Sequence, residues 1–269
     1  MTHEAISVQT LHGVTTITLN RPQRMNALSR QMITEVVGVL DAARQGQGRD
    51  TRAIVITGAG RGFCGGADLK DLNSPAGLLP LNSAESKRQG LRMGVYPLIH
   101  GIRQCEVPVI AMVNGDAAAG GCDLALACDI RIGSDRTRFM ESFARIGLFP
   151  GTGGCWFLPR MVGSSKAAEM IFTGDPIGAQ EAYQWGLLSQ LVPHEELLDR
   201  TMTLARRIAA GPPIALRLAK MVMQRSMDMN LETSLELAAA SESITLTSED
   251  HREGLAAFLE KREAKFRGL

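Results

Sequence analysis

The sequence lacks the features that mark secreted, membrane-spanning and zinc-binding proteins. Its five cysteines include no C-x-x-C pair, so we expect buried thiols in a reducing compartment rather than a disulfide framework or a zinc site. No apolar run reaches the roughly 18 residues that a membrane helix needs. The first residues, MTHEAISVQT, contain neither the basic nor the apolar region of a signal peptide. These absences predict a cytoplasmic protein without a bound metal.

The chain also lacks an excess of one charge. It carries 29 basic and 28 acidic residues, with a net charge of +1, and Lys and Arg are spread along its length. We therefore expect neither nucleic acid nor an anionic membrane as a partner. Apolar residues make up 45% of the 269 positions, enough for a large core in one domain or in one domain with an appendage.

Several catalytic and nucleotide-binding motifs are missing. GAGRGF (58–63) follows an apolar strand pattern, but Phe63 stands where a dinucleotide fingerprint needs its third glycine. No G-K-[ST] follows, so a phosphate-binding P-loop is excluded too. There is no G-x-S-x-G, and HEELL (194–198) is not the H-E-x-x-H of a zinc protease.

What is present is an alternation of strand and helix patterns. Two short strands are expected within residues 5–19, joined at His12-Gly13, and a helix over 30–45 after Ser29. RAIVIT (52–57) and VPVIAMV (107–113) are continuous apolar strands of the kind buried on both faces, with a helix expected over 84–103 between them. Helical periods dominate after about residue 194. The pattern predicts an α/β core over 1–195 and a helical section over 196–269.

Two of the buried strands lead into turns of small residues with a carboxylate nearby. These are GFCGGADL (62–69) and AAAGGCDL (117–124), and each is expected to enter a helix. The first N–H groups of a helix have no internal partner and lie at the positive end of its dipole. If two such ends converge, they form an oxyanion hole, in which small residues leave room for a substrate oxygen. The alternative for each glycine is close packing of backbones.

The chain resembles the crotonase (enoyl-CoA hydratase/isomerase) superfamily nearly from end to end. The segments that carry the resemblance are NRPQRMNALS (20–29), AIVITGAGRGFCGGADLKDL (53–72), VNGDAAAGGCDLALACDIRI (113–132), FMESFARIGLFPGTGG (139–154), LPRMVG (158–163), AYQWGLLSQLVP (182–193) and EGLAAFLEKREAKF (253–266). The resemblance implies a spiral of ββα units, with a C-terminal helical section that mediates oligomerisation and covers part of the active site and the CoA. It also implies a homotrimer or homohexamer, an acyl-CoA substrate and no cofactor beyond the coenzyme A of that substrate.

The resemblance further implies the binding residues. The backbone N–H groups of Ala67 and Gly120 would form the oxyanion hole. The expected contacts with CoA and substrate are Arg24, Met25, Ala27, Gly65, Asp68, Leu69, Phe143 and Lys261. Asp68 has a structural alternative, because an aspartate at a helix start also caps the helix. Lys261, with Lys265, is expected either to reach CoA phosphates of a neighbouring subunit or to form a solvated face.

The family pattern breaks at the second acid. Hydratases of the family carry two glutamates, whose positions here are Asp123 and Phe143, and phenylalanine cannot transfer a proton. If residues 139–143 are extended, Glu141 shares a face with Phe143 and supplies the second carboxylate. Its alternative is a surface or interface salt bridge. Asp123 can also act alone, moving a proton between C2 and C4 of a 3-enoyl-CoA, and an apolar pocket beside Phe143 would raise its pKa.

The sequence therefore predicts an enoyl-CoA hydratase or double-bond isomerase that forms an enolate, with Asp123 as the principal acid and base. Phe143 is expected to narrow the pocket and to stack on an unsaturated or aromatic acyl group. Two alternatives remain open. One is another crotonase-fold reaction, such as thioester hydrolysis, C–C cleavage or dehalogenation. The other is a non-catalytic acyl-CoA-binding protein, which would have no need of a carboxylate at position 123.

Overall fold

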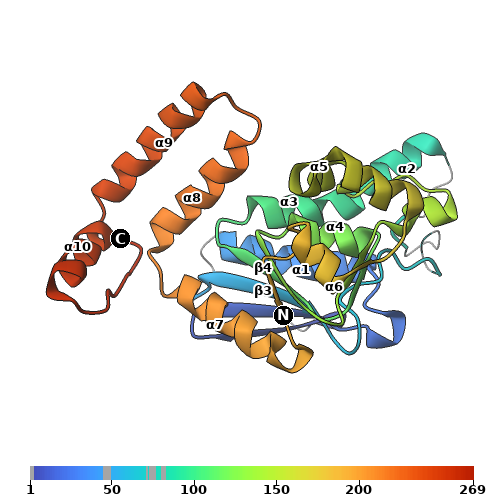
Figure 1. Cartoon of the computed structure of the whole chain (residues 1–269), viewed down its shortest axis with the longest axis horizontal. Helices are drawn as coiled ribbons and strands as arrows, with labels where there is room; N and C mark the ends of the chain where they lie inside the picture. Colours follow the sequence, from blue (N-terminus) through green and yellow to red (C-terminus); the bar gives the residue numbers. More distant parts are fainter. Residues whose placement is uncertain (1–2, 45–49, 71, 73–76, 80–82) are drawn as a thin grey trace.

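The protein is built around a six-stranded sheet, seen in a computed structural model that describes residues 3–44, 50–70, 72, 77–79 and 83–269. The strand order is β1-β2-β3-β4-β6-β9, with bounds Ile6–Leu11, Val14–Leu19, Ala53–Gly58, Val109–Val113, Ile130–Ser134 and Gln190–Val192. The β1–β2 pair is antiparallel and every later pair is parallel. The predicted α/β fold with a helical C-terminal section is confirmed (Figure 1).

Local sequence explains the first elements. His12 and Gly13 take φ values of 50° and 77°, which close the tight hairpin between β1 and β2. Helix α1 (Arg30–Arg44) begins after Ser29, whose hydroxyl accepts the Met32 N–H at 3.2 Å. Gln45, the last residue of the predicted helix, lies outside the described residues.

The sheet is covered on both faces, which is why its strands read as continuous apolar runs. Alternate side chains of β3 belong to different cores. Ile54 and Ile56 pack with the apolar stripe of α1, whereas Ala53 and Val55 pack with α7 (Leu197–Ala209). Figure 1 shows α7 on the opposite side of the sheet from α1.

A second sheet positions the functional site. It joins β5 (Asp116–Ala118), β7 (Arg138–Met140) and β8 (Ile177–Gly178). Because β5 and β7 are parallel with Ala118 opposite Met140, the chain leaves both strands at the same edge. The segments that follow therefore begin side by side: α4 (Gly120–Ala127) after β5 and the short 3-10 helix η3 (Ser142–Ile146) after β7.

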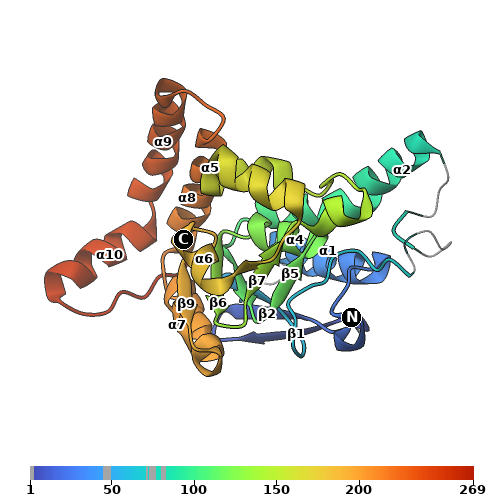
Figure 2. The same cartoon turned by 45° about the vertical axis from the view of Figure 1, so that its right-hand side comes forward.

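The remaining helices surround these sheets or project from them. The surrounding elements are η1 (Pro22–Arg24), α2 (Ala84–Gly90), the π-helical turn η2 (Leu91–Val95), α3 (Tyr96–Gln104), α5 (Gly154–Thr173), α6 (Ala179–Gln184) and η4 (His194–Glu196). Figures 1 and 2 show α8 (Pro213–Ser226), α9 (Leu231–Leu246) and α10 (Glu249–Glu260) extending away from the sheets. The proposed division near residue 195 falls just before α7. None of the helices in the described residues is long and apolar enough to span a membrane.

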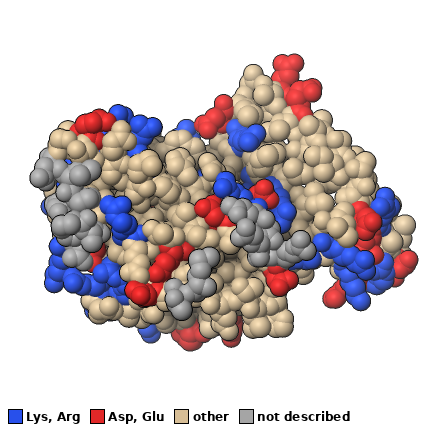
Figure 3. Space-filling model, turned by 180° about the vertical axis from the view of Figure 1, so that it is seen from behind, with Lys and Arg blue, Asp and Glu red and all other residues tan. Residues whose placement is uncertain are grey.

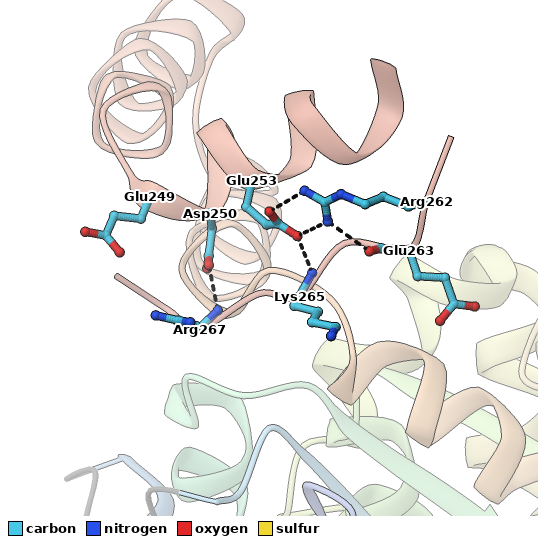
Figure 4. Close-up of a pocket in the computed structure, with 7 residues that line it drawn as sticks. All are labelled: Glu249, Asp250, Glu253, Arg262, Glu263, Lys265 and Arg267. Atoms are coloured by element: carbon cyan, nitrogen blue, oxygen red, sulfur yellow. Dashed lines mark hydrogen bonds and ion pairs between the residues drawn. The ribbon is translucent and has the colours of Figure 1, made fainter. Parts of the chain in front are cut away.

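The C-terminal tail returns to α10 (Figure 4). The Asp250 carboxylate accepts the N–H groups of Arg267 and Gly268 at 2.7 and 2.9 Å, and Glu253 pairs with the Arg262 guanidinium. Figure 3 shows acidic and basic side chains gathered at this outer end of the projecting helices. The guanidinium of Arg262, followed by the Lys265 N–H, holds the pKa of Glu253 down to about 2.

Candidate active site

The structure brings the two small-residue turns into contact. Gly66 has a φ of 88°, and a Cβ added there would lie 2.9 Å from the Ala118 carbonyl oxygen and 3.4 Å from the Gly120 nitrogen. A side chain at position 66 would therefore force the turns apart. Glycine is needed here both for the left-handed backbone and for the close approach.

Each turn contributes one backbone donor. Leu28 bridges to Ala67: the Leu28 N–H donates to the Gly66 carbonyl at 2.7 Å, and the Asp68 N–H donates to the Leu28 carbonyl at 3.1 Å. The Ala67 N–H between them has no hydrogen-bond partner among the described residues. The Gly120 N–H opens the first turn of α4, where amides lack intrahelical partners. Ala67 and Gly120 line one cavity, so both donors are available to a ligand oxygen.

The helix predicted after the first turn is wrong. Leu69 and Lys70 form a turn, none of residues 68–70 is helical, and Asp71 lies outside the described residues. The bridge between Leu28 and Ala67 holds this backbone in an extended pairing, directly after the left-handed Gly66. The Ala67 donor is thus oriented by a β-bridge, whereas the Gly120 donor is oriented by a helix start.

The backbone is strained at the residue before the Gly120 donor. Ala119, immediately before Gly120, has φ 47° and ψ −122°, a region that residues with a Cβ rarely occupy. Its N–H donates to the Met140 carbonyl at 2.8 Å, which ties the strained residue to the end of β7. Such backbone conformations cost about 1–3 kcal/mol and are typical of functional sites.

Two carboxyl groups meet below this turn. Asp123, on the first turn of α4, and Glu141, at the end of β7, are both 0% exposed. A Cβ added at Gly154 would lie 2.9 Å from Glu141 Oε1 and 3.0 Å from Asp123 Oδ1, so the two groups flank one point. The Thr152 hydroxyl donates a hydrogen bond to Asp123 Oδ2. Asp123 Oδ1 and both Glu141 oxygens have no other donor among the described residues.

Burial dominates the ionisation of this pair. It raises the pKa of Asp123 to about 7, against the lowering effect of hydrogen bonds with Thr152 and Glu141. Burial, followed by the charge of Asp123, raises the pKa of Glu141 to about 9. The predicted direction for Asp123 agrees with this. Near neutral pH the pair therefore holds at least one proton, and its charge does not exceed −1.

The predicted local structure around Glu141 is wrong in two respects. Strand β7 ends at Met140 and residues 142–146 form a 3-10 helix, so 139–143 is not extended throughout. The surface or interface salt bridge is also contradicted, because Glu141 is buried and has no ion pair among the described residues. The turn directs Glu141 inward to Asp123 and Phe143 outward to the cavity.

The cavity beside the two donors is apolar and has a volume of about 370 Å³. One wall carries Leu28, Leu69, Leu72, Leu78, Leu79, Leu91 and Val95, and the other carries Phe143, Ile146, Leu148 and Phe149. Thr152 also lines it, so Asp123 lies one side chain behind the lining.

Of the predicted CoA contacts, four lie beside the first donor. Met25 takes a left-handed φ of 51°, and its carbonyl accepts the Gly65 N–H at 2.8 Å. Gly65 and Leu69 line the cavity, and Ala27 is buried directly before Leu28. Arg24, at the end of η1, lies 3.9 Å from Asp68.

Asp68 has a structural role in this segment. It is 5% exposed and pairs with the Arg21 guanidinium at 2.8 Å, and the same guanidinium donates to the Ala27 carbonyl at 2.8 Å. The pair fastens the 21–27 loop to the Ala67 turn. This fits the structural alternative for Asp68, although the bond is an ion pair and not a helix cap.

Sequence reasoning missed several residues of the site. Asn26 is fully buried, and its amide donates to the carbonyls of Ala59 and Gly62 at 2.9 Å each. Thr152 and Gly154 belong to PGTGG, the third glycine-rich turn, whose similarity to the other two was the available signal. Arg21 and Asn26 belong to NRPQRMNALS, but their partners Asp68, Ala59 and Gly62 lie more than 30 residues away, so the segment alone does not indicate these bonds.

Lys261 is not brought to this cavity within one chain. It ends α10 with a φ of 56°, and no residue of 249–269 lines the cavity. Figure 1 places α10 at the opposite end of the molecule from α2. Among the described residues neither Lys261 nor the Lys265 ammonium has a recorded ion pair.

The chain is similar to known proteins over nearly its whole length. A family model described as enoyl-CoA hydratase/isomerase matches residues 9–268. The chain is 39% identical over 268 residues to a probable enoyl-CoA hydratase of Rhodobacter capsulatus, covering all of both chains. It is 37% identical over 257 residues to 1,2-epoxyphenylacetyl-CoA isomerase of Escherichia coli, covering 95% of each. The solved enoyl-CoA hydratase of Bacillus anthracis superposes with a TM-score of 0.91 at 34% identity, covering 99% of this chain and 100% of that one.

Proposed function

The chain belongs to the enoyl-CoA hydratase/isomerase family, and from that premise we propose that it isomerises an acyl-CoA thioester through an enolate, with Asp123 as the acid and base. Membership at this identity makes it an enoyl-CoA hydratase or isomerase acting on acyl-CoA. The observation that carries the mechanism is the convergence of two unpartnered backbone donors with a buried carboxyl group.

Each part of the site has one task in this reaction. The thioester oxygen lies between the N–H groups of Ala67 and Gly120. Asp123 takes a proton from C2 of a 3-enoyl-CoA, and the electron pair moves onto the thioester oxygen, where the two donors stabilise it. Such a donor typically contributes about 10²–10³ in rate. Asp123 then returns the proton at C4, which completes the double-bond shift with a single carboxyl group.

Isomerisation is favoured over hydration because Phe143, and not a second acid, stands among the described residues that line the cavity. Phe143 occupies the position of the family's second glutamate and cannot transfer a proton. Glu141 lies behind the described lining, as Asp123 does, and the two carboxyls are close together. Hydration remains the second candidate, and the closeness of the two carboxyls supports it. In that case Asp123 and Glu141 together would orient and deprotonate a water molecule.

We further propose a large apolar acyl group as the substrate's tail. The cavity of about 370 Å³ is lined mainly by leucines and by Phe143 and Phe149. Its polar side chains among the described residues are Ser142, Arg145 and Thr152, of which Arg145 pairs with Asp175 and Thr152 with Asp123. Phe143 lines the cavity, and we propose that an unsaturated or aromatic acyl group packs against its ring.

The CoA contacts, the assembly and the location of the protein remain proposals. The 3′-phosphate-ADP group would lie along the 21–27 loop and Gly65, with Lys261 reaching it from a neighbouring copy in a homotrimer or homohexamer. We propose a role in fatty acid β-oxidation from the same resemblance, and a cytoplasmic location from the cysteine pattern and the first residues of the sequence. Thioester hydrolysis, C–C cleavage and a non-catalytic acyl-CoA-binding role are the other outcomes to be tested.

One experiment tests the proposed reaction. The protein is incubated with 2-enoyl-CoA and 3-enoyl-CoA thioesters in D₂O, and deuterium incorporation, hydration and free CoA are followed by mass spectrometry. We expect double-bond migration with deuterium exchange, lost in Asp123→Asn and kept in Glu181→Gln, an exposed carboxylate on α6. Unchanged activity in Asp123→Asn would refute the assignment of the base. Absence of any reaction in the wild type would favour the non-catalytic alternative, and release of CoA would favour hydrolysis.

A further inference from the structure

We propose that Glu141 is a positioning residue that shares one proton with Asp123, so that the two carboxyl groups act as a single acid–base unit. The inference rests on the proposed function, because it assigns the second carboxyl of the same site. It gives Glu141 a task that needs no contact with the substrate.

Among the described residues the two groups have few neighbours besides each other: the Thr152 hydroxyl bonds Asp123, and the Cys122 thiol lies beside Glu141. Both side chains are fully buried, and their facing oxygens lie within 3.0 Å of the same added Cβ position at Gly154. Three of their four oxygens have no donor among the described residues apart from a proton held between them. Two bare carboxylates in such a place would repel each other, whereas a carboxylic acid donates to a carboxylate and satisfies both. One shared proton is therefore the arrangement with the lowest energy.

Among the described residues no cation lies beside the pair to neutralise it. The titratable groups that interact with it are the thiols of Cys122 on α4 and Cys155 on α5. The charged and titratable side chains on the surrounding elements are engaged elsewhere or exposed: Arg145 pairs with Asp175, Arg138 with Asp116, Arg103 lies over the Trp156 ring, and His100 and Glu181 are exposed. One of the two negative charges must therefore be neutralised by a proton, as Lys or Arg would neutralise it in an ion pair.

The start of α5 stabilises the remaining charge. Gly154 is the first residue of this 20-residue helix, and Gly153 accepts the N–H groups of Trp156 and Phe157. The N–H groups of Gly154 and Cys155 have no recorded partner among the described residues. The positive end of the helix thus lies against the pair, where it favours one negative charge. A Cβ at position 154 would collide with both carboxyls, so glycine permits this approach.

The shared proton fixes the order of events. Glu141 stays protonated and donates to Asp123, and Asp123 is the carboxylate that meets the substrate. When Asp123 removes the C2 proton, the electron pair of the C–H bond moves to the thioester oxygen and Glu141 keeps its own proton. The charge of the site stays at −1 throughout, which avoids building a dianion in a buried space. Ionisation of Glu141 at high pH would remove the donor and place a second charge beside the enolate.

Two variants separate this role from a structural one in the pH profile of kcat/KM. In Glu141→Gln the amide still donates to Asp123 but cannot ionise, so we expect a rate within about threefold of wild type and no fall on the alkaline side. In Glu141→Leu the donor to Asp123 is lost, which should raise the pKa of Asp123. The acid side of the kcat/KM profile should then shift to higher pH by at least about one unit, and kcat/KM at pH 7 should fall roughly tenfold. Glu181→Gln is the control and should keep the wild-type profile. A Glu141→Gln profile with the wild-type alkaline limb would overturn the proposal.

A second measurement does not depend on catalysis. The ¹³C NMR titration of the Glu141 carboxyl is recorded in wild type and in Asp123→Asn, with Glu141→Gln used to assign the signal. We expect Glu141 to titrate at least one pH unit lower once Asp123 is replaced, because the neighbouring charge is gone. An identical titration in both proteins would overturn the shared proton even where the isomerase reaction is found. A shifted titration in a protein without that reaction would uphold the pair and refute only the proposed function.

Discussion

Asp68 and Asp123 stand at similar places in two similar sequences, GGAD and GGCD, yet their surroundings differ. Asp68 is paired with Arg21 at 2.8 Å and follows a turn held by a β-bridge. Asp123 lies on the first turn of α4 and faces Glu141, with no cation beside it among the described residues. One carboxylate is compensated by a guanidinium and the other by a proton.

This difference teaches how one sequence pattern serves two tasks. A carboxylate with a guanidinium partner keeps its charge and holds two segments together, but it cannot readily exchange protons. A carboxyl group whose pKa is raised to about 7 by burial is poised to give and take protons at neutral pH. The Ala67 turn is held by the Arg21–Asp68 pair, whereas the Gly120 turn leads into the helix that carries Asp123, the acid and base of the proposed reaction.

The largest effect should come from removing each carboxylate in turn. Asp123→Asn should lower the exchange rate by about 10²–10⁴, the usual contribution of a general base. Asp68→Asn should lower kcat by less than about tenfold, because the Ala67 donor loses a support and not its N–H group. The measurement is deuterium exchange into 3-enoyl-CoA at pH 7.5. Equal losses in the two variants would contradict the division of tasks.

The two aspartates should also differ in how stability responds to pH. Burial raises the pKa of Asp123 from 3.8 to about 7, so the folded state holds this proton more tightly than the unfolded state does. The contribution of Asp123 to the free energy of unfolding is therefore complete below about pH 4. It falls by about 1.4 kcal/mol per pH unit as the pH rises towards 7. Asparagine does not titrate, so Asp123→Asn should melt at a higher temperature than wild type at pH 7.5 and at nearly the same temperature at pH 4. Thermal melts between pH 4 and 9 check this, with Glu181→Gln as the control. A temperature difference that does not grow with pH would contradict it.

From the residues alone the convergence of the two turns was a condition, and the family resemblance turned it into a prediction. The physical reason for the small residues is the close approach between Gly66 and Gly120, which larger side chains would prevent. The helix after Ala67 was predicted from its apolar and charged pattern, but pairing with Leu28 overrode that local preference. Tertiary pairing of this kind leaves no periodic trace in a sequence.

The environment of the carboxyls was less predictable still. Glu141 was expected to reach the site if residues 139–143 were extended. The strand ends at Met140, and Glu141 reaches the site from the residue between this strand and the 3-10 helix η3. Its partner Asp123 lies 18 positions earlier, and the bond of Asp68 to Arg21 spans 47 positions. A residue type indicates which bonds a side chain can make, whereas the fold decides which partner is present.

Breaking the Asp68 pair should cost stability more than activity. Asp68→Asn leaves the Arg21 guanidinium, whose side chain is 18% exposed, without its carboxylate, and we expect a loss of about 2 kcal/mol in the free energy of unfolding. KM for acyl-CoA should rise severalfold because the 21–27 loop is released. Asp116→Asn is the matched control: its Arg138 partner is 54% exposed, and the loss should stay below about 1 kcal/mol. Urea unfolding measures the loss in free energy of unfolding in both variants. Equal losses would show that the buried Arg21–Asp68 pair contributes no more to stability than the exposed Arg138–Asp116 pair.

The smallest effect on stability should come from Ala119, the strained residue directly before Gly120. Ala119→Gly removes the Cβ that makes φ 47° and ψ −122° unfavourable, which should gain about 1 kcal/mol or more. The greater freedom of glycine in the unfolded chain offsets about 0.5–1 kcal/mol of that, so the net change should be between zero and a small stabilisation. Ala118→Gly removes the same atoms from strand β5 and should destabilise by about 1 kcal/mol. In Ala119→Gly the rate should fall about threefold, because the Gly120 N–H is less firmly oriented. Equal destabilisation in the two variants would mean that the backbone at Ala119 stores no strain, and that the donor is oriented by the start of α4 alone.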